Sequence, residues 1–378
     1  MTLEVNNIIS GKREFLDIPG AVLSSILQDH PEGEDIFMAP GLFDLQVNGY
    51  MNIDFNCHEL SVSATEQAVI ELLKDGVTRF FPTLITNDPE ILEHNLNILN
   101  QAIEKNPLVR SCIPGIHLEG PFISSKEGFL GAHNNRWVLK PDWKLFEKWQ
   151  KISGNNIQLI TLSPEYKEST DFIKLCVKNN IKVAIGHSAA GAEQVQEAVS
   201  AGATLSTHLG NAIPLNINRH SNILFDQLAE DDLYASIITD GHHLPESLIK
   251  IILRSKPGKV FLISDSTKFT GLKAGVYNTV IGGKVILDEN RNLSIYDNQE
   301  FNAGAASSLY QCVNFLSKRK LLSLSEAWKA ASIVPHKYLY RQYPPKDNQD
   351  MVLFSYINEN IQILSGIKHN PQFSYYSN

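Results

Sequence analysis

Short apolar runs alternate with longer amphipathic segments through most of the chain. The amphipathic segments have apolar residues three and four positions apart, which is typical of helices, and turns separate them from the runs. The runs predict strands over Gly41–Val47, Arg79–Leu84, Cys112–Leu118, Gln158–Leu162, Lys182–Gly186, Thr204–Thr207, Tyr234–Thr239 and Lys259–Ser264. The amphipathic segments predict helices that include Ala64–Lys74, Glu90–Lys105, Trp143–Lys151, Thr170–Lys178, Glu193–Ser200 and Pro245–Arg254. Eight strand and helix units of this kind favour an α/β fold, a closed (β/α)8 TIM barrel.

The two ends of the chain have a different pattern. Residues 1–38 contain short alternating runs and turns, and the runs MVLFSYI and IQILSGI flank an Asn-Glu-Asn turn as in a hairpin. We therefore expect residues 1–40 and 343–378 to form one small β-sandwich domain, with the barrel over residues 41–342. Further hairpins are expected within Tyr277–Phe301, after the eighth barrel strand.

Polar side chains stand at the ends of most of the predicted barrel strands, which is where barrels of this kind place their active sites. Glu119, His187 and His208 end three different strands. One carboxylate and two imidazoles form a three-ligand set that leaves a position open for water, as in catalytic zinc sites. A lone histidine is usually a packed or solvated residue, but two histidines and a glutamate at the ends of three strands favour a metal. Iron, cobalt, nickel and manganese are alternatives to zinc.

Asp265 ends the eighth predicted strand, in the segment VFLISDST. A carboxylate at this position can be a metal ligand, a general base or the N-cap of the following turn. N-capping is the commonest role of an aspartate after a strand. A metal in the same pocket favours the base, because an aspartate can accept a proton from water that the metal has made more acidic.

Three further residues are candidates for substrate contact or support. The segment DGHH places His242 and His243 next to each other, so we expect only one of them to face the pocket. Arg219 lies on a long loop with few other basic residues, which suits a phosphate or carboxylate, although a solvated arginine fits the spacing equally well. His117 precedes Glu119 by two residues and is expected to be a packed support rather than a fourth ligand.

Composition and charge narrow the possible partners. The chain has 378 residues, 43% of them hydrophobic and 20% charged, which is typical of a globular protein. Its formal charge of −8 argues against nucleic acid or an anionic membrane as the main partner. The four cysteines form no CxxC pair and are expected to be reduced, and no stretch predicts a signal peptide or a membrane span. The cytoplasm is the expected location.

The motifs together resemble one enzyme family. In order, they are HLEGPF and GAH within 117–133, GHS at 186–188, HLGNAIP with Arg219, DGHH at 240–243, SD at 264–265 and NAG at 302–304. This ordered set is similar to that of the N-acetylglucosamine-6-phosphate deacetylases of the amidohydrolase superfamily. The resemblance extends from about Ala39 to His336.

The resemblance implies a homodimeric, metal-dependent barrel that hydrolyses the acetamide of N-acetylglucosamine 6-phosphate to glucosamine 6-phosphate and acetate. It implies that Glu119, His187 and His208 hold the metal, that Asp265 is the acid/base, and that His243 assists catalysis. Substrate contacts are implied for Gln46, Ala132, His133, Asn211, Ala212, Arg219, Asp240, His243, Asn302, Ala303 and Gly304. In this family the arginine that matches Arg219 can reach the phosphate across the dimer interface.

The chain departs from the family pattern in three places. Many amidohydrolases carry His-x-His at the end of the first strand and bind two metals, whereas this chain has Gln46, Val47 and Asn48. Because amides are poor metal ligands, we predict one divalent metal per chain, with Gln46 orienting the bound water. Gly210 replaces a common aromatic residue, and His220–Asn222 replaces an acidic turn. Both of these changes lie near the expected sugar-phosphate pocket.

Other functions fit the same residues. The chain could deacetylate another N-acetylhexosamine, such as N-acetylgalactosamine 6-phosphate, or hydrolyse N-acyl amino acids. A catalytically silent sugar-phosphate-binding protein is a third alternative, which the intact set of three ligands and Asp265 argues against.

Overall fold

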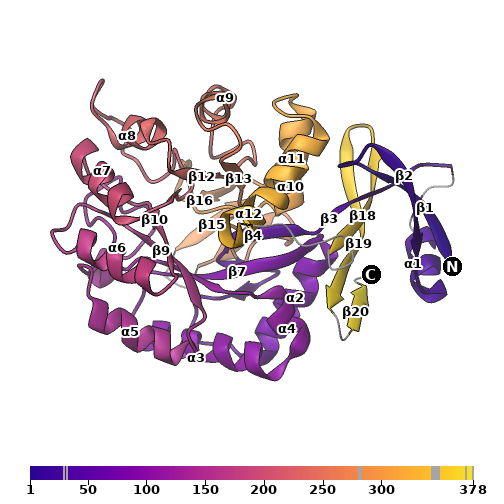
Figure 1. Cartoon of the computed structure of the whole chain (residues 1–378), viewed down its shortest axis with the longest axis horizontal. Coiled ribbons are helices and arrows are strands. Elements are labelled where there is room, and N and C mark those ends of the chain that lie inside the picture. The colour runs from indigo at the N-terminus through magenta and orange to yellow at the C-terminus, as the bar shows by residue number, and fades with distance from the viewer. Residues whose placement is uncertain (29, 31–32, 280–282, 342–349, 371–372, 377–378) are drawn as a thin grey trace.

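A computed structural model describes residues 1–28, 30, 33–279, 283–341, 350–370 and 373–376. Eight parallel strands form a barrel, and helices surround them (Figure 1). In sheet order the strands are β13 (Val260–Leu262), β12 (Tyr234–Ile237), β11 (Leu205–Ser206), β10 (Lys182–Ile185), β9 (Ile157–Leu162), β8 (Ile116–Glu119), β7 (Val77–Ile85) and β4 (Leu42–Val47). The predicted TIM barrel is confirmed.

The seam between β4 and β13 is closed by contacts just outside the ladder. Val47 and Ser266 form a parallel bridge, and the backbone N–H of Ser264 lies 3.2 Å from each carboxylate oxygen of Asp44. The Gln46 N–H also donates to Asp44, at 3.2 Å. Because Asp44 is fully buried, desolvation raises its pKa to about 7. Asp44 therefore joins the strand that carries Gln46 to the strand that leads to Asp265.

Most barrel helices lie within one or two residues of their predicted bounds. They are α2 (Val62–Lys74), α3 (Pro89–Lys105), α5 (Trp143–Ile152), α6 (Ser169–Lys178), α7 (Ala192–Ala201) and α9 (Glu246–Ser255). The chain also forms α8 (Ile223–Ala229), α10 (Leu309–Lys318), α11 (Leu324–Ala330), α12 (Ile333–Tyr340) and the 3-10 helix η1 (Asn135–Trp137).

The predicted strand over Cys112–Leu118 begins too early. Residues Pro107–Cys112 form a short helix, α4, and the strand starts at Ile116. Asn106 explains the helix, because its Oδ1 accepts a hydrogen bond from the Leu108 N–H at 2.9 Å and Pro107 occupies the first turn. The sequence pattern also missed α1 (Gly20–Gln28) within the N-terminal strands.

Both ends of the chain contribute to one six-stranded sheet beside the barrel (Figure 1). Its order is β2 (Lys12–Asp17), β1 (Thr2–Asn7), β3 (Ile36–Pro40), β18 (Met351–Ile357), β19 (Asn360–Asn370) and β20 (Phe373–Tyr376). The predicted hairpin of β18 and β19 turns at Asn358 and Glu359, whose φ angles of 50° and 61° are those of a two-residue hairpin turn. The expected pairing of the two termini is confirmed.

A buried ion cluster joins this sheet to the barrel. The Asp350 carboxylate lies 2.7 Å from Lys368 Nζ in β19 and 2.9 Å from Arg79 Nε in β7. Lys368 is only 1% exposed, and burial lowers its pKa. Residues 343–349, at the start of the predicted C-terminal part of the small domain, lie outside the described residues.

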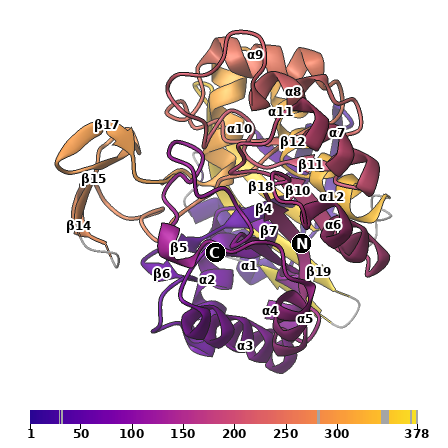
Figure 2. The same cartoon turned by 90° about the vertical axis from the view of Figure 1, so that its left-hand side faces the viewer.

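The predicted hairpins after the eighth strand form a four-stranded antiparallel sheet. Its strands are β14 (Gly275–Asn278), β15 (Lys284–Leu287), β16 (Leu293–Ile295) and β17 (Asn298–Asn302). The sheet projects from the side of the barrel (Figure 2). A small two-stranded sheet of β5 (Gly49–Tyr50) and β6 (Ile53–Asp54) follows the first barrel strand.

The barrel interior is divided into layers. Near the N-terminal ends of the strands, Phe43, Phe81, Leu159 and Phe261 form a buried apolar cluster with Tyr338 of α12. The polar side chains that matter for chemistry lie above this cluster, at and just before the C-terminal ends of the strands.

Candidate active site

Three atoms able to bind a metal converge at the C-terminal end of the barrel. Glu119 Oε1 lies 3.0 Å from His208 Nε2 and 3.4 Å from His187 Nε2, and the two Nε2 atoms are 3.1 Å apart. The three side chains come from the ends of β8, β10 and β11, as the sequence predicts, and all three are buried.

The backbone at these strand ends has an unusual conformation. His187, His208 and Asp265 have φ angles of 49°, 32° and 50°, in the left-handed region that residues other than glycine seldom adopt. Each such residue costs on the order of 1–3 kcal/mol and persists only where its surroundings hold it. At His208, the backbone N–H donates to Ser236 Oγ at 2.9 Å. Strain of this kind is concentrated at functional sites.

A backbone carbonyl determines which ring nitrogen of His187 can bind a metal. Its Nδ1 lies 3.0 Å from the backbone carbonyl oxygen of Phe129, which can only accept a hydrogen bond. Nδ1 therefore carries a proton, so a lone pair for metal binding can lie only on Nε2, which faces Glu119 and His208. This is the tautomer that a metal ligand needs.

The spacing of the three atoms fits a tetrahedral metal. Zinc bonds of about 2.0–2.1 Å keep ligand atoms about 3.3 Å apart. The three observed separations, 3.0, 3.1 and 3.4 Å, bracket that value. The donor set also fits, because imidazole and carboxylate ligands suit zinc and several other divalent metals.

His133, a predicted substrate contact, lies beside this cluster. Its Nε2 is 3.3 Å from His187 Nε2 and 4.0 Å from Glu119 Oε2. Glu119, His133 and His187 offer ligand atoms within 4.8 Å of one another. Burial lowers the pKa of His133 to about 3, so its ring is neutral and could serve either as a ligand or as a substrate contact.

Electrostatics favour a charged Glu119. Burial alone would raise its pKa, but hydrogen bonding and charge interactions with His187 and His208 hold the pKa well below the ordinary value. Burial lowers the pKa of His208, and Glu119 more than reverses this effect. The site therefore stabilises a carboxylate in a buried pocket that would otherwise exclude one.

Two amides hold Asp265 beside the cluster. Gln46 Nε2 donates to Glu119 Oε1 at 2.9 Å and to Asp265 Oδ1 at 3.0 Å, and Asn48 Nδ2 donates to the same Oδ1 at 2.7 Å. Burial, followed by the charge of Glu119, raises the pKa of Asp265 to about 6. The described residues donate no hydrogen bond to its Oδ2, so this oxygen can take up a proton.

The DGHH turn separates its two histidines. Asp240 Oδ2 lies 2.8 Å from His243 Nδ1, while Asp240 Oδ1 accepts from the backbone N–H groups of His242 and His243 at 2.9 and 3.1 Å. His242 turns away, and its Nε2 lies 2.8 Å from the Asn290 carbonyl oxygen of the inserted sheet. Burial would lower the pKa of His243, but Asp240, and then the charge of Asp265, raises it.

A belt of hydrogen bonds crosses the barrel directly below the cluster. His117 Nε2 lies 2.7 Å from Thr161 Oγ1, which is 2.7 Å from Thr207 Oγ1. On the other side, His117 Nδ1 lies 3.4 Å from Thr83 Oγ1, which accepts from the Val47 N–H at 3.1 Å. Burial lowers the pKa of His117 to about 4, so the ring is neutral. We call Thr83, His117, Thr161 and Thr207 the polar belt.

The other predicted substrate residues lie on the loops around the cluster. Ala132 is exposed beside buried His133, and a Cβ on Gly131 would lie 3.8 Å from the Ala212 Cβ, so these two loops are in contact. Asn211 Nδ2 donates to the His208 carbonyl oxygen at 3.1 Å. Around the DGHH turn, Asn302 Nδ2 donates to the His242 carbonyl oxygen at 3.3 Å and is followed by half-buried Ala303 and Gly304.

Arg219 is not brought to the cluster within this chain. It lies in the exposed stretch Leu215–His220, and it makes no hydrogen bond or ion pair with any described residue. Leu215 in the same stretch is 89% exposed.

Family comparison gives the site its context. The model of the amidohydrolase family matches residues 37–342. The chain belongs to the amidohydrolase family. This confirms the superfamily that the motifs indicate, and the chain is a hydrolase.

Two known proteins, one of them represented by two solved structures, extend the comparison. N-acetylglucosamine-6-phosphate deacetylase of Bacillus subtilis (strain 168) is 31% identical to this amidohydrolase over 266 residues, which cover 70% of this chain and 66% of that protein. The crystal structure of N-acetyl-D-glucosamine-6-phosphate deacetylase from Mycobacterium smegmatis superimposes with a TM-score of 0.81 at 22% identity, covering 97% of this chain and 98% of that one. A mutant of that protein in complex with N-acetyl-D-glucosamine-6-phosphate gives 0.80 at 21% identity, covering 97% of each chain. At these identities the two structures establish the fold.

One of the positions at which this amidohydrolase departs from the family pattern, Gly210, has a structural reason. Gly210 has a φ angle of 98°, and a Cβ there would lie 2.9 Å from Leu244 Cδ2 and 3.0 Å from Leu248 Cδ2. Both the backbone and the space available therefore favour glycine.

Sequence reasoning missed several residues that surround the site. Glu165 follows β9 by three residues in the segment TLSPE, and its position after a strand could have indicated it. Thr161 and Thr207 lie two residues beyond inward-facing Leu159 and Leu205, so two-residue alternation could have placed them in the lumen. The Phe129 carbonyl, which orients His187, has no sequence signal.

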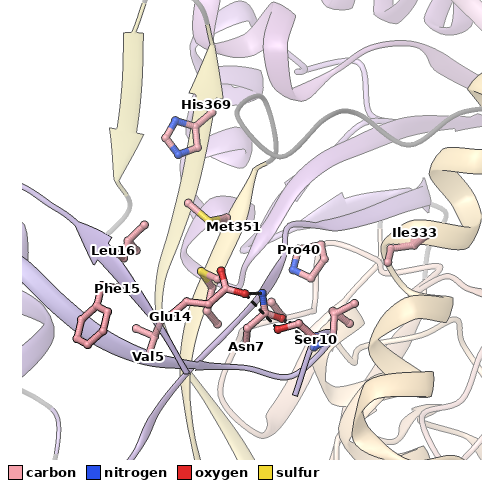
Figure 3. Close-up of a pocket in the computed structure, with 13 residues that line it drawn as sticks. Val5, Asn7, Ser10, Glu14, Phe15, Leu16, Pro40, Ile333, Met351 and His369 are labelled. Carbon is pink, nitrogen blue, oxygen red and sulfur yellow. Dashed lines mark hydrogen bonds between the residues drawn. The ribbon is translucent and has the colours of Figure 1, made fainter. Parts of the chain in front are cut away.

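A cavity of about 670 Å³ lies away from this site, between the sheet of the two termini and the start of α12 (Figure 3). Val5, Phe15, Met38 and Met351 are among its lining residues, and Glu14 accepts hydrogen bonds from neighbours in its own hairpin. The cavity contains none of the predicted site residues. We assign the chemistry to the strand ends, where ionisable groups converge and their pKa values are shifted.

Two remaining observations concern the chain as a whole. The four cysteines are unpaired, as expected, and three of them are buried. None of the helices in the described ranges has the length and apolar character needed to cross a membrane.

Proposed function

We propose that this amidohydrolase removes the acetyl group of N-acetylglucosamine 6-phosphate, giving glucosamine 6-phosphate and acetate. The observation that carries the proposal is the convergence of Glu119, His187 and His208 beside Asp265, whose pKa is raised to about 6. The relatives named for this reaction support the choice of substrate.

One divalent metal per chain would be held by Glu119, His187 and His208, with zinc as the expected ion and iron, cobalt, nickel or manganese as alternatives. When bound, it supplies a Lewis acid that polarises the acetyl carbonyl and makes water more acidic. Gln46 occupies a position where many amidohydrolases have a second-metal ligand, and its amide instead donates to Glu119 and Asp265. This arrangement supports a single metal.

Asp265 would act first as base and then as acid. Its Oδ2 takes the proton of the attacking water and later delivers it to the amine that leaves. A pKa near 6 suits both steps, because the group is mostly ionised at neutral pH but not strongly acidic. Asp240 raises the pKa of His243 and so favours a ring with both nitrogens protonated, in which Nδ1 donates to Asp240 and Nε2 would donate to the developing oxyanion.

The sugar would lie against the loops that surround the cluster, which carry Ala132, His133, Asn211, Ala212, Asn302, Ala303 and Gly304. We propose further that two copies of the chain form a dimer in which Arg219 reaches the substrate phosphate of the partner subunit. Its exposed position, beside exposed Leu215 and Ile217, supports this arrangement.

Acetate release from a substrate panel tests the reaction. The panel contains N-acetylglucosamine and N-acetylgalactosamine, each with and without a 6-phosphate, and an N-acetyl amino acid, assayed on protein of measured metal content. The proposal predicts the highest kcat/KM for N-acetylglucosamine 6-phosphate. Faster release from the galactosamine epimer or from the amino acid would show that this compound, and not N-acetylglucosamine 6-phosphate, is the substrate. No release from any of them would indicate a silent binding protein.

Mixed dimers test the role of Arg219. Arg219→Ala and Asp265→Asn are each expected to be impaired, the first mainly through a raised KM for phosphorylated sugar. If Arg219 acts across the interface, a mixed dimer has one site with both native residues, and mixing restores activity. A mixture no more active than its separate components would place Arg219 in its own subunit's site or outside any site.

A further inference from the structure

Glu165 connects three of the loops at the C-terminal end of the barrel. It lies on the loop after β9, and its side chain is 11% exposed. Its Oε1 accepts from Ser124 Oγ of the β8 loop at 3.2 Å, and its Oε2 accepts from the Ala189 N–H of the β10 loop at 2.9 Å. Within its own loop, Ser163 Oγ donates to Oε2 at 2.8 Å.

The β8 and β10 loops that Glu165 contacts are each connected directly to His187. Ser124 donates its backbone N–H to the His187 carbonyl oxygen at 2.8 Å. Phe129, five residues further along the same loop, provides the carbonyl that fixes the His187 tautomer at 3.0 Å. Ala189 follows His187 by two residues. Glu165 therefore holds the loop that orients the imidazole and the backbone that carries it.

Neighbouring contacts make this arrangement rigid. Ser163 and Ser188 hydroxyl oxygens are 2.9 Å apart, and both residues are buried. Tyr166, next to Glu165, donates its hydroxyl to the Ile123 carbonyl oxygen at 2.7 Å. These bonds surround His187, whose φ angle of 49° needs support from its surroundings.

We propose that Glu165 is a positioning residue that sets the orientation of His187 for metal binding, although its own carboxylate contacts only Ser124, Lys126, Ser163 and Ala189. This inference rests on the proposed metal site. Partners of this kind behind a metal ligand typically change metal affinity or activity by about 10–100-fold when they are removed. Glu165 acts through the backbone and the Phe129 carbonyl rather than by a direct bond to the ring.

The chemistry of the two oxygens sets the choice of variants. Glu165→Ala removes both acceptors and separates the two loops. Glu165→Gln keeps one oxygen for the Ala189 N–H, while its amide can face the Ser124 hydroxyl, which is able to accept as well as donate. The glutamine variant is therefore the conservative rescue.

Two control variants separate positioning from ordinary destabilisation. Lys126→Ala removes only a 3.8 Å ion pair to Glu165 from a side chain that is 62% exposed. Ser323→Ala removes the N-cap of α11, where Ser323 Oγ accepts from the Glu326 N–H at 3.3 Å, and is expected to lower Tm without touching the site.

The test is zinc affinity by chelator competition, measured with the Tm of the metal-free proteins and with kcat/KM. We expect Glu165→Ala to weaken zinc binding about 10–100-fold and to lower kcat/KM, while Glu165→Gln recovers most of both. Lys126→Ala and Ser323→Ala should keep wild-type zinc affinity. Equal zinc affinity in Glu165→Ala and wild type, or an equal loss in Ser323→Ala, would overturn the inference. A wild-type protein that binds no zinc or related metal would instead overturn the proposed function.

Discussion

The two ends of the barrel interior are built from different chemistry. At the N-terminal ends of the strands, Phe43, Phe81 and Phe261 pack with other apolar residues in a buried cluster. At the C-terminal ends, other strands of the same barrel lead to a buried carboxylate and imidazoles such as Glu119 and His208, with side-chain atoms 3.0 Å apart. One end has the composition of a core, and the other has that of a reactive site.

This difference indicates how the fold divides its tasks. The C-terminal end carries left-handed backbone at His187, His208 and Asp265, each on the order of 1–3 kcal/mol of strain. The N-terminal end contributes apolar burial and the Asp350 ion cluster that joins the six-stranded sheet to the barrel. We call the C-terminal ends of the strands the upper end of the barrel and the N-terminal ends the lower end. We expect substitutions at the upper end to change activity more than stability. Substitutions at the lower end should change stability more than activity.

The largest expected effect is on catalysis at the upper end. Asp265→Asn should lower kcat by about 10²–10⁴-fold, because a positioned acid/base contributes this much. Metal content and Tm should stay near wild type, since the amide still fits between Gln46 and Asn48. Near-normal turnover in metal-loaded protein would remove Asp265 from the acid/base role.

The matching change at the lower end should act on stability instead. Asp350→Asn leaves buried Lys368 and partly buried Arg79 without their shared carboxylate. Breaking a buried pair in this way costs about 3–5 kcal/mol, measurable as a lower free energy of unfolding in urea. The kcat of the folded fraction should remain within about twofold of the wild-type value, because Asp350 lies at the end of the barrel away from the cluster. A strong loss of kcat with little loss of stability would contradict that division.

A pair of threonine variants compares the two ends with the same chemistry. Thr161→Val removes a hydroxyl from the polar belt and leaves His117 Nε2 unsatisfied, whereas Thr204→Val removes one that lies 3.1 Å from the Tyr338 hydroxyl at the lower end. Each loss should cost about 1–3 kcal/mol, with the more buried Thr161 at the upper limit. Only Thr161→Val should also weaken metal binding, because the belt lies beneath Glu119. Equal metal affinity in the two variants would show that the belt supports stability alone.

The smallest expected effect is a pH dependence of the Asp240 and His243 pair. The pKa of Asp240 is lowered to about 2 by His243, despite burial, so its stabilisation is present above the ordinary value of about 3.9 and is lost as pH falls through 2. The raised pKa of His243 means that its stabilisation is complete below about 6.5 and is lost as pH rises through the folded value. The pair is therefore strongest between about pH 4 and 6.5.

Thermal unfolding of metal-free protein measures this window. The Tm difference between wild type and Asp240→Asn should be largest near pH 5.5 and should shrink as pH is raised above 7. Metal-free protein is needed because metal binding depends on pH itself. A difference that stays constant from pH 5 to 9 would show that the pair does not titrate as described.

The sequence allowed the barrel and the convergence of Glu119, His187 and His208 to be predicted, because both leave local signals. Strand and helix periodicity indicated the eight units, and Glu119, His187 and His208 each follow an apolar run. The helix over Pro107–Cys112 was missed because a short apolar run has no clear period, and the capping by Asn106 is a single-residue signal.

Long-range geometry explains the rest of what the sequence did not reveal. The polar belt depends on which residues of different strands meet inside the barrel, and the Phe129 carbonyl depends on the path of a loop. His133 is predicted as a substrate residue from the sequence, and only the structure shows that it also lies 3.3 Å from His187. Pairings between distant segments are set by tertiary packing, which no local pattern records.

Anomalous diffraction from crystals of the zinc-loaded protein, recorded at the zinc edge, tests the central claim most directly. The account predicts one strong peak per chain at the C-terminal end of the barrel, bonded to Glu119 Oε1, His187 Nε2 and His208 Nε2 at about 2.0–2.1 Å. The same map shows whether His133 is a fourth ligand. Two peaks per chain, or a peak that these three atoms do not bind, would contradict the account.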